Sequence, residues 1–127
     1  MLILSADSPG ASGVIPNIVV TRDRMPTDLP SAPQERMNAL LDRQVAQMRS
    51  QLAGFAEISR RLVANSVHPT AELKVNWDSA QAALTQSLTF VDRGVQGLIV
   101  ATSTAGRGEF AELEPTFRET LQSFRLG

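Results

Sequence analysis

Residues 70–77 (TAELKVNW) alternate strictly between polar and apolar side chains, which leaves few choices of local structure. Successive side chains of a β-strand point to opposite faces of the sheet, so a period of two is typical of a strand with one buried face. Residues 80–91 alternate in the same way, and residues 97–104 (GLIVATST) form a mostly apolar run that suits a central strand. The middle of the chain is therefore predicted to form a sheet.

Two other segments carry apolar side chains at helical spacing. The first should run to about residue 52, with Ser31 and Gln34 as a capping pair, Pro33 in its first turn and Gly54 as its left-handed end. Its apolar stripe comprises Met37, Leu40, Leu41, Val45, Met48 and Leu52. A last helix, with Pro115 near its start, carries Phe110, Leu113, Phe117, Leu121 and Phe124 on a narrow face.

Residues 1–4, 14–23 and 55–63 also favour strands. Strands thus dominate the middle of the chain and helices occur at two points, which is the α+β pattern of one antiparallel sheet with helices packed on it. The length of 127 residues favours one domain. We therefore expect residues 1–127 to form a single α+β domain with two main helices.

Charge and composition exclude several classes of partner. Twelve Lys and Arg against thirteen Asp and Glu give a net charge of −1, and the charges are mixed along the chain, whereas nucleic-acid binding needs a basic stripe. No apolar run approaches the ~20 residues of a membrane span, and residues 1–20 lack the regions of a signal peptide. The chain has no cysteine, which permits a reducing compartment. We expect a cytoplasmic protein that binds no nucleic acid and does not insert stably into membranes.

Residues for catalysis follow no recognised motif. His68, the only histidine, lies in a predicted turn before Pro69, and no motif joins it to a nucleophile. No Gly-rich phosphate loop precedes a helix. Glu109, Glu112 and Glu114 begin the predicted last helix, where acidic side chains favour the helix dipole. We expect no enzymatic activity, no metal and no cofactor.

Two glutamines interrupt apolar faces. At 100° per residue, Gln44 lies near the centre of the stripe on the first helix, and Gln86 shares a strand face with Leu84 and Leu88. A buried amide needs a hydrogen-bonding partner. Either the two amides bond to neighbouring loop backbone or lie at the edge of the apolar face, or they line an open apolar groove that binds a partner.

The order of several segments resembles a known family. Residues 17–23 (NIVVTRD), 41–44 (LDRQ) and 51–55 (QLAGF), followed by 84–86 (LTQ), 98–104 and 115–124, are similar to the DcrB-related domain. Within that family they resemble most the Eag-type chaperones of type VI secretion effectors. The similarity covers nearly the whole chain.

The resemblance implies a Mog1/PsbP-like fold, a curved antiparallel sheet packed with helices, from which the N-terminal part of the usual domain is missing. It implies a cytoplasmic homodimer that binds the apolar N-terminal transmembrane helices of a secreted effector and shields them before export. The positions that correspond to the family's partner-binding groove are Leu2, Leu4, Val19, Thr21, Gln44, Met48, Leu52, Ala82 and Gln86.

A different class of function uses the same sheet face: a lipid or small-molecule carrier, or a structural protein-binding module, in either case without catalysis. A carrier would bury an enclosed pocket, whereas a chaperone for helices needs an open and elongated groove. The sequence names neither the effector nor the number of helices bound.

Overall fold

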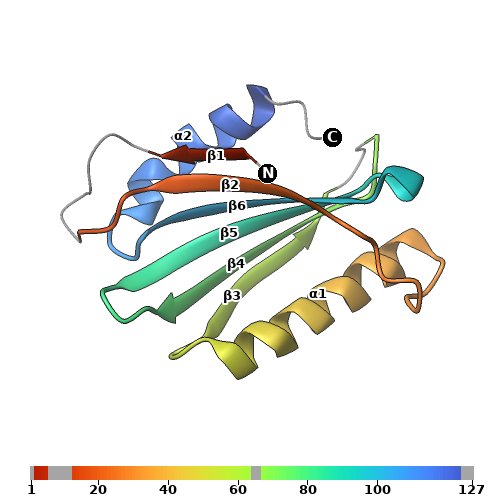
Figure 1. Cartoon of the computed structure of the whole chain (residues 1–127), viewed down its shortest axis with the longest axis horizontal. Coiled ribbons are helices and arrows are strands. Elements are labelled where there is room, and N and C mark those ends of the chain that lie inside the picture. Colours follow the sequence, from red (N-terminus) through yellow and green to blue (C-terminus); the bar gives the residue numbers. More distant parts are fainter. Residues whose placement is uncertain (1, 6–12, 64–66, 124–127) are drawn as a thin grey trace.

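The computed structural model describes residues 2–5, 13–63 and 67–123. Six strands form one curved antiparallel sheet in the order β1-β2-β6-β5-β4-β3, and two helices accompany it (Figure 1). The elements are β1 (Leu2–Ser5), β2 (Asn17–Asp23), α1 (Pro33–Gln51), β3 (Ala56–Leu62), β4 (Thr70–Asp78), β5 (Ala83–Asp92), the 3-10 turn η1 (Gly94–Gln96), β6 (Leu98–Gly106) and α2 (Phe110–Ser123). The predicted α+β class is confirmed.

The alternating segment forms β4 as predicted. Leu73 and Val75 are fully buried, and they face the same side of the sheet as the partly buried Trp77. The apolar run forms β6, which pairs with β2 on one side and with β5 on the other. The side chains of β6 are buried or half-buried on both faces of the sheet, which explains why they need not alternate in polarity.

The predicted capping pair at the start of the first helix is wrong. Ala32, not Ser31, is the N-cap of α1, and no side chain caps the helix. Ala32 precedes Pro33 and is extended, with φ −67° and ψ 129°, as the residue before a proline prefers. Pro33 lacks a backbone N–H and presets φ, so the proline defines the first turn where a capping side chain was expected.

Each helix builds a core on its own side of the sheet. The core beneath α1 contains Met37, Leu40, Leu41, Val45, Met48, Ala71, Leu73, Val75, Leu88, Phe90 and Leu98, with Met25 from the loop after β2. The core beneath α2 contains Ile18, Ala105, Phe110 and Phe117, with Leu4, Val20, Leu113 and Leu121 packed against it. The predicted apolar face of the last helix is confirmed for its described members, and Phe124 lies outside the described residues. Neither helix is long and apolar enough to cross a membrane, as far as the described residues extend.

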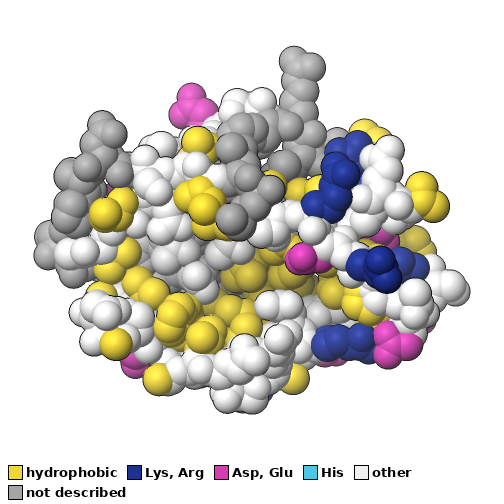
Figure 2. Space-filling view, viewed as in Figure 1, with side chains coloured by type: hydrophobic (Ala, Val, Ile, Leu, Met, Phe, Trp, Pro, Cys, Tyr) yellow, Lys and Arg dark blue, Asp and Glu magenta, His cyan; other side chains and the backbone are white. Residues whose placement is uncertain are grey.

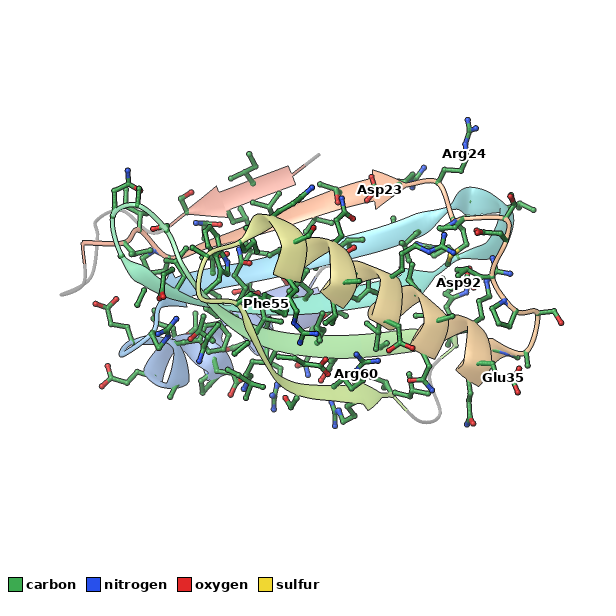
Figure 3. All side chains as sticks on the ribbon, turned by 90° about the horizontal axis from the view of Figure 1, so that it is seen from below. Asp23, Arg24, Glu35, Phe55, Arg60 and Asp92 are labelled. Carbon is green, nitrogen blue, oxygen red and sulfur yellow. The ribbon has the colours of Figure 1, made fainter. Side chains whose placement is uncertain are left out.

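Arg60 fastens α1 to the edge strand β3. Its Nε and Nη2 atoms donate to the carboxylate of Glu57 at 2.7 and 2.9 Å, and its Nη1 atom donates to Asp42 Oδ1 on α1 at 2.7 Å. The hydrogen bonds from Arg60 lower the pKa of Glu57. Figure 3 shows Arg60 on the strand that runs beside α1. The helix is thereby held toward the β3 edge of the sheet, away from β2.

The turn between β5 and β6 contains two glycines with positive φ, and the structure separates their roles. A Cβ atom on Gly97 would lie 2.7 Å from the backbone oxygen of Asp23, whereas a Cβ atom on Gly94 would meet nothing within 4 Å. We expect Gly94→Ala to lower the free energy of unfolding by about 1 kcal/mol, the cost of a left-handed alanine. Gly97→Ala should cost about 2–4 kcal/mol because β2 and β6 must also move apart. Urea unfolding of both variants measures the difference, and equal losses would contradict the close contact with Asp23.

Candidate functional site

One side of the sheet is only partly covered. The backbone of α1 runs closest to β3 and β4. On β5, β6 and β2, several side chains that point to the α1 side of the sheet are therefore only half-buried. We call this surface of β5, β6 and β2 the open face. Its half-buried side chains are Asn17, Val19, Thr21, Gln86, Val100 and Thr102. Figure 2 shows hydrophobic and uncharged side chains across the middle of the molecule, with most of the visible Lys and Arg side chains at the right end.

Strand pairing fixes which side chains share the open face. Val19 lies opposite Thr102, and Thr21 lies opposite Val100, across the β2–β6 pair. Gln86 on β5 lies opposite Thr104 on β6. Across the β2–β6 pair, Val19 and Val100 of the open face therefore each have a threonine as cross-strand neighbour.

The Gln86 amide is held by two side chains. Trp77 Nε1 donates to Gln86 Oε1 at 2.8 Å, and Gln86 Nε2 donates to Thr104 Oγ1 at 3.0 Å. The amide therefore bridges β4, β5 and β6, and among the described residues it bonds to neither loop backbone nor helix. An amide nitrogen has two N–H donors and its oxygen has two lone pairs, so Gln86 keeps one donor and one acceptor for a further partner.

Gln44 lies on the side of α1 that faces away from β3. Asp42 binds Arg60 of β3, and Gln44 is rotated about 200° from Asp42 around the helix. Gln44 is half-buried, and its side chain makes no hydrogen bond within the described part of the chain. The amide of Gln44 is thus available, whereas that of Gln86 is largely engaged.

The remaining predicted groove residues divide between different parts of the fold. Met48 is 8% exposed and belongs to the core beneath α1, and Leu52 packs against that core. Leu4 packs on the opposite side of the sheet, in the core beneath α2. Leu2 pairs with Val20 in the register, and its side chain lies outside the described residues. Ala82 is half-buried in the β4–β5 turn, where its N–H donates to Ser79 Oγ.

The α1 side of the sheet therefore brings together Val19, Thr21, Gln44, Met48, Leu52 and Gln86 but not Leu4. Val100, Thr102, Thr104 and Trp77 belong to the same surface, although sequence analysis did not identify them as site residues. The sequence does contain a pattern that indicates them, because Thr102 and Thr104 are two residues apart and so lie on the same face of a strand over residues 97–104. The apolar character of that segment concealed the alternation.

A charged cluster lies at one end of α1. Arg36 Nε is 3.2 Å from Asp92 Oδ2, and Asp92 Oδ1 accepts a hydrogen bond from the N–H of Gly94 at 2.9 Å. Figure 3 shows Asp92 between the start of α1 and the end of β2. The pair places charge at this end of the α1 side, as does Asp23 at the end of β2, whereas the half-buried side chains of the open face are uncharged.

The chemistry available on the open face is that of contact and hydrogen bonding. The described residues contain no group of three or more His, Cys, Asp or Glu side chains that could hold a metal ion. Apolar side chains, hydroxyls and amides together can cover an apolar partner that also presents a few polar groups.

Known proteins match this chain both in family and in fold. The family model described as DcrB matches residues 3–123. Eleven chains of solved structures are similar, including PA94 from Pseudomonas aeruginosa, a protein of unknown function that has been suggested to be a regulator. Its TM-score is 0.78 at 21% identity, and the match covers 95% of this chain and 78% of that one, which shows a shared fold. No curated protein sequence matches this chain.

The two glutamines should respond differently to replacement by leucine. Gln86→Leu leaves the indole N–H of Trp77 without its partner and should lower the free energy of unfolding by about 1–2 kcal/mol. Gln44→Leu removes no hydrogen bond to a described residue and should leave the free energy of unfolding within about 0.5 kcal/mol of the parent or raise it. Urea unfolding measures both.

A double-mutant cycle provides the control. Phe at position 77 has no N–H, so Gln86→Leu should cost roughly 1 kcal/mol less in the Trp77→Phe background than in the parent. Equal costs in the two backgrounds would show that the Trp77–Gln86 hydrogen bond does not stabilise the domain.

Proposed function

The chain belongs to the DcrB family, and from this premise we propose that it is a chaperone or adaptor for a type VI secretion effector. In this proposal it binds the apolar N-terminal transmembrane helices of the effector in the cytoplasm and shields them from water before export. The observation that supports the proposal most directly is the open face, a half-buried surface without charged side chains on a sheet that α1 covers only in part.

The energetic basis of such binding is the burial of apolar surface. A transmembrane helix in water exposes apolar area worth about 25 cal/mol for each Å² that a partner covers. Val19 and Val100 supply apolar contact from the sheet, and Met48 borders it from α1 with a side chain that adapts to irregular shapes. Contact of this kind makes few demands on the sequence of the bound helix.

The polar groups of the open face would bind polar groups of the partner. Transmembrane helices often pack through small residues, which leave Ser and Thr hydroxyls and backbone carbonyls accessible. Gln44, the free donor of Gln86 and the hydroxyl of Thr102 could bond to such groups. Binding alone accounts for this function, and no catalytic step is needed.

A charged side chain on the open face should abolish binding. Val19→Glu would bury a carboxylate against an apolar helix, and we expect the affinity for an effector's N-terminal segment to fall at least tenfold. Val95→Glu is the matched control because Val95 is fully exposed on η1, outside the open face. Co-expression of each variant with the segment, followed by co-purification and a melting curve of the free domain, measures the effect. Equal retention of the segment by both variants would refute the proposed surface.

We also propose that the protein forms a homodimer through β1. Both edge strands expose an isoleucine, Ile3 of β1 at 53% and Ile58 of β3 at 49%, but only β3 also carries charged side chains, Glu57, Arg60 and Arg61. Charged side chains discourage pairing at an edge, and their absence permits it. Light scattering at ~100 µM should report a dimer that Ile3→Lys converts to a monomer. A parent protein that is monomeric at every salt concentration would contradict the proposal.

A further inference from the structure

The side of the sheet opposite the open face contains a pocket that the proposed function does not use. It lies between α2 and the strands β3, β4, β5 and β6, and its volume is about 850 Å³. Sites for small molecules measure roughly 300–1,000 Å³. The pocket is therefore large enough for a small ligand and distinct from the surface proposed to bind helices.

Hydroxyl groups line the sheet side of this pocket. Ser87 and Thr89 on β5 and Ser103 on β6 contribute side chains, none of which makes a hydrogen bond within the described part of the chain. Ser103 is 1% exposed, and its Oγ atom is buried without a partner. A buried hydroxyl without a partner costs free energy, so an unpartnered one that lines a pocket points to a ligand that completes its hydrogen bonds.

The charges around the pocket favour an anionic ligand. Both acidic side chains in the lining are already paired, since Glu72 binds Arg61 at 2.8 Å and Glu114 binds Lys74 at 2.6 Å. Arg118 of α2 also lines the pocket and forms no ion pair with any described residue. The lining thus retains an uncompensated positive charge.

Three side chains of α2 give the pocket an apolar wall. Phe110, Phe117 and Leu121 of α2 face the pocket, and the rings of Phe110 and Phe117 lie 5.5 Å apart between centroids. An apolar wall opposite a floor of hydroxyl donors, beside an Arg118 that pairs with no described carboxylate, suits a ligand whose two ends differ in polarity. We propose that this pocket binds a single-chain amphiphile with an anionic head, its head at the hydroxyls and Arg118 and its alkyl chain along α2.

Decanoate below its micellar concentration is the first probe, with binding measured by isothermal titration calorimetry. We expect Ser103→Ala to weaken decanoate binding about fivefold or more, through the loss of a hydrogen bond to a charged head. The free variant should melt at the same temperature as the parent or higher, because the deleted hydroxyl has no partner. Arg118→Gln should weaken binding about threefold, more at low salt than at high salt.

The adjacent residue on β6 provides the matched control. Thr102 points to the open face, so Thr102→Val should leave decanoate binding within about twofold of the parent. Decyltrimethylammonium has the same chain with a cationic head and should bind at least tenfold more weakly than decanoate. Decyl phosphate tests which anionic head group the pocket prefers. If it binds more tightly than decanoate, the natural ligand carries a phosphate, and if it binds more weakly, the ligand carries a carboxylate.

The proposal is overturned if Ser103→Ala and Thr102→Val bind decanoate equally, or if the cationic amphiphile binds as well as the anionic one. Either result would place the alkyl chain on an apolar surface without recognition of its head. The outcome is independent of effector binding, because Val19→Glu alters the open face alone and should leave decanoate binding unchanged. Loss of effector binding and loss of decanoate binding can therefore be told apart.

Discussion

The register of β5 between β4 and β6 determines which side of the sheet each important side chain occupies. Leu73 lies opposite Leu88, and Leu88 lies opposite Thr102. Side chains at matching positions of β4, β5 and β6 therefore point to the same side of the sheet, and we call this alignment the phase of the three strands. A slip of one residue would move Gln86 to the α2 side and Ser87 to the α1 side. The two cores, the open face and the α2-side pocket all depend on this phase, which is set by the burial of Leu73, Val75 and Phe90 under α1.

Because the phase is set by hydrophobic burial, most of the fold could be predicted from the sequence. The alternation in residues 70–77 and the helical stripe from Met37 to Met48 each report one buried face directly. The start of α1 could not be predicted in the same way, since a Ser-x-x-Gln pattern competes there with Pro33. Proline determines its own φ and restricts Ala32, and these covalent constraints outweigh a capping bond that is worth only about 1 kcal/mol.

The candidate site was predicted in part, for a similar reason. Gln44 and Gln86 were identified because a polar residue among apolar neighbours is visible in one strand or helix. Leu4 was placed with them, yet it packs against the core beneath α2. Which face of β1 carries Leu4 depends on its pairing with Ile18 in β2, a long-range register that alternation within four residues does not determine. The hydroxyls of Ser87 and Ser103 were missed because each is ordinary in its own strand, and only the pairing of β5 with β6 brings them together.

A surface that binds an apolar helix must remain soluble when empty, and the pairing across the open face suggests how both demands are met. Val19 lies opposite Thr102 and Val100 opposite Thr21, so apolar and polar side chains alternate across the β2–β6 pair, and Asn17, Thr104 and Gln86 form a polar row beside them. Contiguous apolar patches promote association, and this arrangement interrupts them without introducing charge. Polar side chains in a half-buried surface lose part of their hydration and need hydrogen-bonding partners. Trp77 and Thr104 supply those partners for Gln86. A bound helix would therefore meet a polar group that is already oriented, so the entropy of fixing the Gln86 side chain is lost on folding rather than on binding.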